Sequence, residues 1–381
     1  MEPLKNMFNG LFYKSIADEF SKLNFGFDSK SFLTDCSFKL EHLSLSQRLR
    51  QTTLALKKYL PENYPKAINL MNIVITKTKP GYTNLIFPDY VGLFGHHDFK
   101  TSMQALHYFT QFGSSEFAIR EFLKKDFNKT ILVMQKWATD KNYHVRRLSS
   151  EGSRPRLPWA FKLDEVIVNP NKTKLILETL KTDSSLYVKK SVANHLNDIS
   201  KQHPNYIIDL LKSWDRSNIN TYWIAKHACR NLIKKGDLNA LSIFNFESEV
   251  KIKLINFKLS SKIIELGDSL RFEFDILSLK DNHQKLVLDY GIYYPSIKTI
   301  KKYKIFKLKE FILKSNQEIH ISKKQIFKDL STRKYKEGLY NLVLFVNGKE
   351  YFKSDFKIKN SYQLKKQSRF VKKICLTLNL Y

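Results

Sequence analysis

The 381-residue sequence has few cysteines, no long hydrophobic run and a minority of acidic side chains. Its cysteines, Cys36, Cys229 and Cys375, lie far apart, with no CxxC pair and no histidine at metal-ligand spacing, which disfavours a disulfide scaffold and a zinc site. No apolar run approaches membrane-spanning length, and the first residues lack the pattern of a signal peptide. We therefore expect a cytoplasmic protein that needs neither a membrane nor a metal ion.

The basic side chains point to a partner of opposite charge. Lys and Arg number 65 against 36 Asp and Glu, which leaves a net charge of +29 spread along the whole chain. Because a folded surface this positive repels itself, a polyanion is the expected partner. A genome that encodes lysine wherever a polar residue suffices is the alternative explanation for the excess lysine. It does not explain how the arginines cluster.

Residues 144–159 form the densest cluster, with four arginines, one glutamate and one tryptophan in sixteen positions. Guanidinium groups bind phosphate oxygens in pairs, and an indole offers a flat face. Gly152, Pro155 and Pro158 are expected to end the helix that begins near Val145. The segment therefore places Glu151 at a helix end among cations.

The first 245 residues or so show helical spacing of apolar side chains, with an internal repeat. Segments that begin at Val145, Val188 and Ile224 each follow an amphipathic helix and lie 43 and then 36 residues apart. This period is typical of HEAT or armadillo helix pairs, which stack into a curved solenoid. Each segment carries a basic residue two positions after the aliphatic one, and we expect these residues to line one surface: Arg147, Lys190 and Lys226. Ordinary solvated helix positions are the alternative.

After Phe246 the spacing changes to period two. Roughly seven short strands are expected over residues 248–358, which indicates an immunoglobulin-like β-sandwich without the antibody-type cysteines and tryptophan. The predicted fold class is thus an α-solenoid of HEAT-like repeats followed by an Ig-like β-sandwich. The predicted segments are residues 1–246 for the solenoid, 247–360 for the sandwich and 361–381 for a basic C-terminal tail.

Three motifs carry a resemblance to a known family. They are residues 146–160 (RRLSSEGSRPRLPWA), residues 102–122 with SMQAL, FTQ and SSEFAIREF, and residues 192–200 (VANHLNDIS). Together they resemble the AlkC branch of bacterial alkylbase DNA glycosylases, in the subset with an appended Ig-like domain. The resemblance runs in order through residues 1 to about 245.

The resemblance implies a monomeric DNA glycosylase of base excision repair, in the bacterial cytoplasm at the nucleoid, that needs no cofactor. It implies excision of cationic N3-methyladenine, and of N3-methylcytosine, from double-stranded DNA without base flipping, unlike the usual extrusion mechanism. It also implies catalytic roles for Glu116 and Glu151, with Trp159 against the sugar and backbone of the lesion nucleotide, Arg147 orienting a carboxylate and Asp198 as a further acid. We expect further DNA contacts from the cations Arg146, Arg154, Arg156, Lys190 and Lys226.

The chemistry is consistent with these residues. An N3-alkylated base is already positively charged and leaves without a general acid. Cleavage builds positive charge on the deoxyribose, which a carboxylate stabilises while it positions or deprotonates the attacking water. A glycosidase acting on a neutral leaving group needs a second acid or base as well.

Each residue also has a plainer interpretation. Glu116 could be a first-turn acid, Glu151 could pair with Arg147 at an exposed helix end for about 0.5 kcal/mol or less, and Trp159 could be a packing anchor. Asp198 could be a solvated helix-end acid. The adjacent pair His96 and His97 invites a metal site, but neighbouring histidines rarely converge on one ion.

Two other functions remain open at this point. One is a catalytically silent HEAT-repeat module that binds DNA or RNA structure through its backbone, and the other is a protein-interaction solenoid. A pure phosphate binder gains nothing from glutamates among its arginines, which favours the enzyme. A net charge of +29 weighs against the protein-interaction solenoid.

Overall fold

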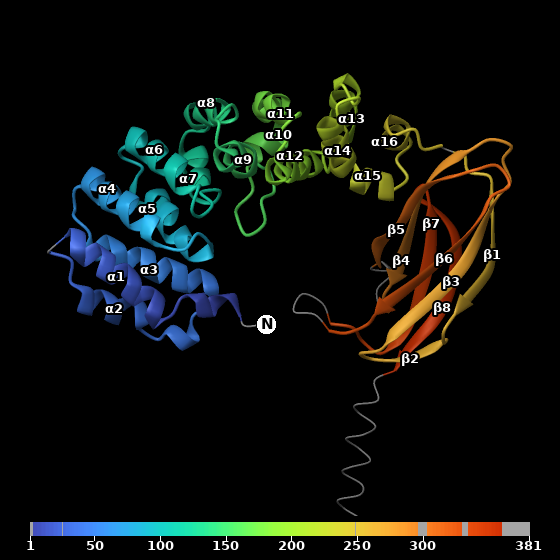
Figure 1. Ribbon diagram of the computed structural model, residues 1–381, viewed down its shortest axis with the longest axis horizontal. Coiled ribbons are helices and arrows are strands. Elements are labelled where there is room, and N and C mark those ends of the chain that lie inside the picture. The colour runs from blue at the N-terminus through green and yellow to red at the C-terminus, as the bar shows by residue number, and fades with distance from the viewer. Residues whose placement is uncertain (1–2, 25, 248, 296–302, 330–333, 360–381) are drawn as a thin grey trace, which may run out of the picture. The chain divides into compact units, whose positions relative to one another are not determined.

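The computed structural model describes residues 3–24, 26–247, 249–295, 303–329 and 334–359. These residues form two compact units, Met1–Ala228 and Cys229–Tyr381. Helices precede strands, as the sequence predicts (Figure 1). The expected basic tail, residues 361–381, lies outside the described residues. No described helix is both long and apolar enough to span a bilayer.

The first unit is built from helices. Its described α-helices are Gly10–Leu23 (α1), Ser29–Ser37 (α2), Leu45–Tyr59 (α3), Tyr64–Val74 (α4), Ile86–Phe94 (α5), Phe99–Phe109 (α6), Ala118–Lys125 (α7), Phe127–Trp137 (α8), Tyr143–Gly152 (α9), Asp164–Val168 (α10), Lys174–Leu180 (α11), Leu186–Ile199 (α12), Pro204–Ser213 (α13) and Ile219–Ala228 (α14). Short 3₁₀ helices cover Leu4–Met7 (η1), Leu40–His42 (η2), Ile75–Lys77 (η3), Tyr82–Leu85 (η4) and Pro170–Thr173 (η5).

These helices lie in two rows (Figure 1). Helices α4, α6, α8, α11 and α13 form the outer row, while α5, α7, α9, α12 and α14 follow the inner side of the arc. Along the inner row, α9 packs against α12 and α12 against α14. The aliphatic residues of the predicted repeat, Val145, Val188 and Ile224, are all fully buried, one in each of these three helices. The repeat detected in the sequence is therefore the core position of successive inner helices.

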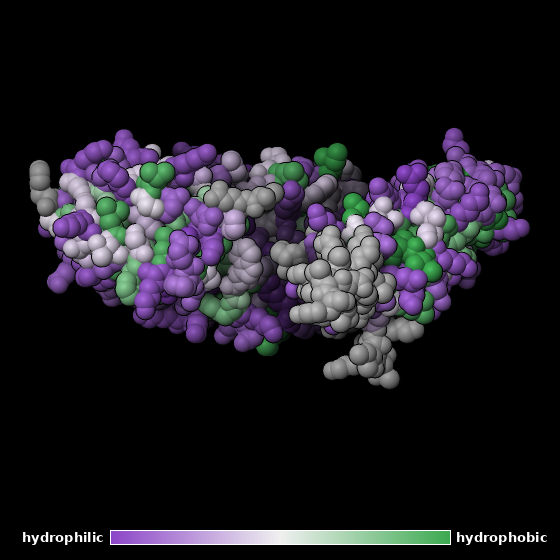
Figure 2. Space-filling view, turned by 90° about the horizontal axis from the view of Figure 1, so that it is seen from below, coloured by the Kyte–Doolittle hydropathy of each residue, from purple (hydrophilic) through white to green (hydrophobic). Residues whose placement is uncertain are grey.

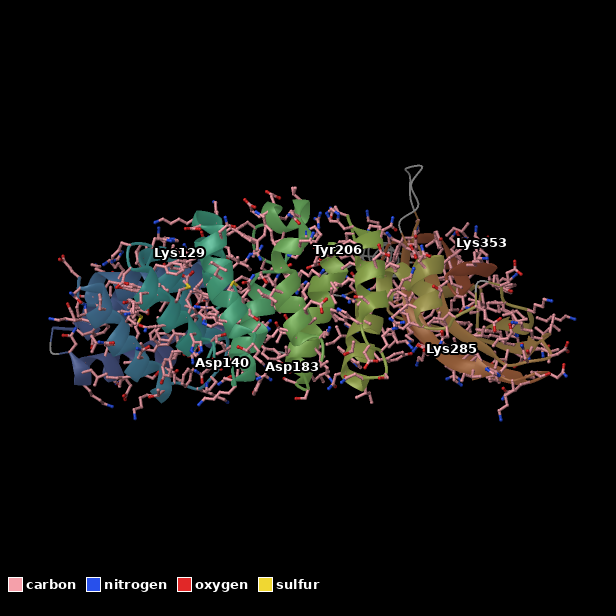
Figure 3. The ribbon with its side chains drawn as sticks, turned by 90° about the horizontal axis from the view of Figure 1, so that it is seen from above. Lys129, Asp140, Asp183, Tyr206, Lys285 and Lys353 are labelled. Atoms are coloured by element: carbon pink, nitrogen blue, oxygen red, sulfur yellow. The ribbon has the colours of Figure 1, made fainter. Side chains whose placement is uncertain are left out.

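Polar contacts from equivalent positions of two successive repeats bind the repeat that follows. Arg146 donates through Nε to Oδ2 of Asp183 over 2.6 Å and through Nη1 to the carbonyl of Asp140 over 2.9 Å. One repeat further on, Nζ of Lys189 donates to Oδ1 of Asn220 over 2.8 Å. Figure 3 shows Asp140 and Asp183 along the same edge of the helical unit. At Val145 and Val188, the residue after the buried aliphatic position thus binds the loop before the next inner helix or the first turn of that helix.

The second unit begins with two short helices and continues as two β-sheets. Its described elements are Arg230–Lys234 (α15), Leu238–Ile243 (α16), Ile252–Leu259 (β1), Ile263–Glu265 (β2), Ser269–Ser278 (β3), Gln284–Tyr293 (β4), Tyr303–Leu313 (β5), Glu318–Ile326 (β6), Gly338–Val346 (β7) and Lys349–Lys359 (β8). One sheet has the order β1-β3-β6 and the other the order β2-β8-β7-β4-β5.

The two sheets enclose one hydrophobic core, with inward residues such as Phe272, Phe274 and Leu342 almost wholly buried. The described residues form one strand more than the predicted count of about seven. The shortest is β2, a three-residue strand that pairs parallel to β8 and is too short to show alternation. A tight turn joins β7 and β8. Asn347 and Gly348 have φ of 46° and 77°, the conformation that an Asn-Gly hairpin turn supplies.

Helices α15 and α16 and the residues after them pack against the five-stranded sheet. Nζ of Lys285 on β4 donates to the carbonyl of Phe244 over 2.8 Å, and Nδ2 of Asn347 donates to that of Glu247 over 3.0 Å. A Cβ on Gly348 would lie 2.2 Å from the backbone nitrogen of Gly236, so the two backbones touch. The segment that links the folds is therefore part of the second unit's packing.

Candidate functional site

The site lies in the first unit, where the loop after α9 meets the turn before α7. A cavity of about 580 Å³ opens there. The residues that line it include Tyr82, Ser114, Glu116, Phe117, His144, Arg147, Glu151, Arg154, Trp159 and Tyr187. The face of the protein seen from below in Figure 2 is largely hydrophilic. Four of the five residues predicted as catalytic thus share one cavity.

Glu116 lies in the turn just before α7, after two serines that make different contacts. Its carboxylate forms an ion pair with Nη1 of Arg147 and accepts a hydrogen bond from the Ser114 hydroxyl over 2.9 Å. The Ser114 hydroxyl in turn accepts from Arg147 over 2.8 Å. Ser115 is buried and donates to the carbonyl of Leu106 on α6 over 2.9 Å. The Ser-Ser-Glu motif therefore fixes a carboxylate to a neighbouring helix and to an arginine.

Glu151 lies at the end of α9 and is only 6% exposed. Its Oε1 accepts from Nη1 of Arg154 over 2.6 Å and lies 3.5 Å from Nη2 of Arg147. Burial alone would raise the pKa of this carboxyl, but the two arginines lower it below its ordinary value. The next residue, Gly152, has no room for a side chain, since a Cβ would approach Ile119 to 2.5 Å. Glu151 is therefore a buried carboxylate that stays ionised, not an exposed helix-end acid.

Asp198 lies on α12, behind the cavity lining. It is 3% exposed, so it is not the solvated acid that the plainer interpretation describes. Its Oδ2 accepts from Nε and Nη2 of Arg154 over 3.0 and 2.8 Å. Burial lowers the pKa of Arg154, but Glu151 and Asp198 outweigh it and raise that pKa above its ordinary value. Asp198 thus acts on the cavity through Arg154.

Trp159 is 83% exposed, which excludes a role as a packing anchor. Its φ is +65°, a left-handed conformation that a bulky side chain rarely adopts. Strained backbone of this kind persists only where the surrounding structure imposes it, and it is frequent at functional sites. The loop therefore presents an indole to solvent at the mouth of the cavity.

The five predicted DNA contacts lie in different surroundings. Arg146 is bound to Asp183 by two hydrogen bonds, and Arg154 is 7% exposed within its pairs with two carboxylates. Arg156 is half-buried, and its Nε has no hydrogen-bond partner. Lys190 is exposed, whereas Lys226 is half-buried with Nζ 3.4 Å from the Tyr222 hydroxyl. Their contacts with DNA stay a prediction, and of the five only Arg154 is among the residues that line the cavity.

Residues that were not predicted also belong to the site or lie directly behind it, and Tyr187 and His195 are two of them. The ring of Tyr187 lies 4.6 Å from the guanidinium carbon of Arg147, a cation–π contact. His195 is fully buried, with Nδ1 3.0 Å from the carbonyl of Ser150, and burial lowers its pKa to about 4. Tyr187 directly precedes the repeat residue Val188, and that position is the one sequence signal that could have indicated it.

The histidine pair does not form a metal site. The ring of His96 packs on that of Phe122, with 4.7 Å between the ring centres, and the ring of His97 packs on that of Tyr64, with 5.1 Å between the centres. The two histidine rings therefore have different neighbours. Among the described residues, no group of three or more His, Cys, Asp or Glu side chains is arranged to hold a metal ion. The side chains that line the cavity supply carboxylates, guanidinium groups, a serine hydroxyl, an imidazole and aromatic rings.

Known proteins match both the helical part and the C-terminal part of this chain. Residues 253–360 match a family described as the C-terminal Ig-like domain of the uncharacterised protein YhaZ. YhaZ of Bacillus subtilis (strain 168) is 40% identical over 316 residues, which cover 83% of this chain and 88% of that protein. The structure of Pseudomonas fluorescens alkylpurine DNA glycosylase AlkC, bound to DNA containing an abasic site analog, matches with a TM-score of 0.91 and 42% identity over 94% of this chain and 100% of that one. The resemblance and the fold class predicted from the sequence are both confirmed.

Proposed function

This chain belongs to the AlkC family, and from that premise we propose that it is a DNA glycosylase that releases alkylated bases from duplex DNA. The proposed substrates are cationic N3-alkylated bases, N3-methyladenine and N3-methylcytosine, which it excises as a monomer without base flipping. Such an enzyme would act on chromosomal DNA in the bacterial cytoplasm, within base excision repair.

The proposed reaction is hydrolysis of the N-glycosidic bond. The bond breaks with its electron pair passing to the charged base, which leaves as a neutral molecule. Water adds to C1′ of the deoxyribose and gives up its proton to a carboxylate. Because positive charge grows on the sugar in the transition state, a nearby ionised carboxylate lowers the barrier.

The observation that carries the proposal is Glu151, a carboxylate that is 6% exposed yet has a lowered pKa. A perturbed buried acid in a cavity is a candidate catalytic group. Glu116 lines the same cavity and is the second candidate for stabilising the sugar or accepting the proton. Arg147 pairs with both carboxylates and would orient them.

Trp159 and Asp198 have different proposed roles. The exposed indole of Trp159 at the cavity mouth is suited to pack against the sugar and backbone of the lesion nucleotide. Asp198 binds Arg154, which binds Glu151, so it would be a positioning residue rather than a group that touches the substrate. Lys190, Lys226 and Arg156 would contribute to phosphate binding outside the cavity.

The proposal is tested by incubating the purified protein with methylated duplex DNA in the presence of a chelator, followed by chromatography of the released bases. We expect N3-methyladenine to appear faster than in the uncatalysed control. Release no faster than in that control, with DNA still bound, would instead support a non-catalytic HEAT-repeat module that binds DNA or RNA structure.

A further inference from the structure

Arg120 on α7 is the largest fully buried side chain among the described residues, and it does not line the catalytic cavity. Burial, and secondly the nearby Arg154, lower its pKa to about 10. Its guanidinium forms no ion pair with a carboxylate in the described part of the chain. Burying a charged group costs free energy of folding unless hydrogen bonds compensate it. The hydrogen-bond partners of Arg120 therefore indicate its role.

Those partners are backbone carbonyls of one loop. Nη1 of Arg120 donates to the carbonyls of Gly152 over 3.0 Å and Arg154 over 2.7 Å, and Nη2 donates to that of Phe161. The guanidinium carbon also lies 5.2 Å from the centre of the Phe161 ring. One planar group therefore holds both ends of the loop that runs from the end of α9 past Trp159.

The loop contains the two features that need a rigid support. Trp159 adopts φ +65° while its side chain is exposed, so its own packing does not hold the strained backbone. Arg154, whose carbonyl Arg120 binds, is the residue that pairs with Glu151. We propose that Arg120 is a positioning residue that fixes the loop and thereby places the Trp159 indole against the lesion nucleotide. The inference rests on the proposed function.

A purely structural role is the alternative, and the chain offers a matched control. Arg48 on α3 is 3% exposed, and its Nη1 donates to the carbonyls of Lys5 over 3.0 Å and Phe8 over 3.1 Å. It holds the N-terminal segment in the way that Arg120 holds the loop. Neither Arg48 nor its partners line the cavity.

The experiment compares Arg120→Lys with Arg48→Lys in the full-length protein. An ammonium group cannot reproduce the planar fork, so both variants should melt at a lower temperature. Only Arg120→Lys should slow single-turnover release of N3-methyladenine, roughly 10- to 100-fold, because small displacements at a reacting centre have effects of this size. Affinity for undamaged duplex should stay within about threefold, because Arg120 is fully buried and its replacement by lysine keeps the positive charge.

Coupling to Trp159 separates positioning from general weakening. In a Trp159→Ala background, Arg120→Lys should slow release by less than about threefold, because residues that act through one another are not additive. The proposal would be overturned if the reductions in release rate caused by Trp159→Ala and Arg120→Lys multiplied in the double variant. It would also be overturned if Arg120→Lys alone left the rate unchanged, or if Arg48→Lys slowed release equally.

A second readout does not depend on activity. Trp159 is 83% exposed, whereas Trp223 is half-buried and Trp137 and Trp214 are 8% and 3% exposed. Quenching of fluorescence by acrylamide, compared with that of a Trp159→Phe variant, therefore reports on the loop. Arg120→Lys should change the quenching and speed hydrogen exchange of residues 153–161, and Arg48→Lys should do neither. If the wild type releases no base, the proposed function fails while this readout still tests the loop. Should Arg120→Lys not fold, Phe161→Ala removes the ring that Arg120 and Lys124 contact and keeps the backbone carbonyl that Arg120 binds. Unchanged exchange in that variant would count against the proposal.

Discussion

Nη1 of Arg154 donates to Oε1 of Glu151 over 2.6 Å, and both side chains are buried. Arg154 also binds Asp198 on a different helix, so a single guanidinium joins the end of α9 to α12. The pair accounts for a carboxylate that remains charged where water is largely excluded, because the nearby cation offsets the cost of burial. The predictions about pH and catalysis follow from this contact.

Replacing Arg154 by Gln should move the acid limb of the excision rate to higher pH. Arg147 and Arg154 together lower the pKa of Glu151, so loss of one cation raises it, and the active carboxylate form is then lost at a higher pH. The same sign applies to stability, since a lowered acid pKa contributes stability that disappears as pH falls through the folded-state value. Arg146→Gln is the control, because Arg146 pairs with Asp183 instead. A pH–rate profile identical to that of the wild type would contradict the assignment.

Lys190 should contribute to the salt dependence of DNA binding, while buried Arg154 should contribute little through phosphate contact. Lys190 is exposed on an inner helix, and each phosphate neutralised adds about −0.9 to the slope of log K against log salt. We expect Lys190→Gln to make the slope shallower by about one unit on undamaged duplex. Lys174→Gln, an exposed lysine on the outer helix α11, should leave it unchanged. Equal slopes for the two variants would remove Lys190 from the DNA interface.

We propose that the second folding unit begins at Cys229 rather than at the predicted boundary of residue 247. Helices α15 and α16 pack on the five-stranded sheet, and Gly236 touches the turn at Gly348. A fragment of residues 229–360 should therefore unfold cooperatively at a higher temperature than a fragment of residues 247–360. Circular dichroism melting of the two fragments measures the difference. Equal melting temperatures of the two fragments would instead support the boundary at residue 247.

Asp289 on β4 should make this unit less stable as pH rises. It is 2% exposed, and burial raises its pKa from 3.8 to about 6 in spite of Lys234 and Lys307. A raised acid pKa favours the folded state at low pH, and this contribution is lost between about pH 4 and 6. Asp289→Asn should stabilise the protein at neutral pH by on the order of 2 kcal/mol. Calorimetry across this range tests it, with exposed Asp268→Asn as the control, and a neutral or destabilising effect at pH 7 would contradict it.

The sequence predicts the order of the two folds and the repeat because both depend on local periodicity. Val145, Val188 and Ile224 fill the same core position, so their spacing is visible without a structure. The ion pairs of the site are not local: Arg154 and Asp198 are 44 residues apart and meet only because α9 packs against α12. No pattern distinguishes these partners from solvated surface charges, so their burial could not be predicted.

Arg120 illustrates the same limit. In the sequence it is one basic residue within the amphipathic stretch that becomes α7. Its three carbonyl partners lie 32 to 41 residues further along the chain. Backbone acceptors leave no mark in the side-chain pattern, and only the folded chain shows that this arginine is buried.

The central claim is that Glu151 and Glu116 are the catalytic groups. Its most direct test is single-turnover release of N3-methyladenine by the wild type, by Glu151→Gln and by the double variant that also carries Glu116→Gln. Loss of one electrostatic stabiliser should slow release roughly 10²–10³-fold in Glu151→Gln, and the double variant should be slower still. Affinity for the duplex should be unchanged, and Glu165→Gln, an exposed acid on α10, should behave as the wild type. If the double variant released the base within about threefold of the wild-type rate, the two carboxylates would not be the catalytic groups.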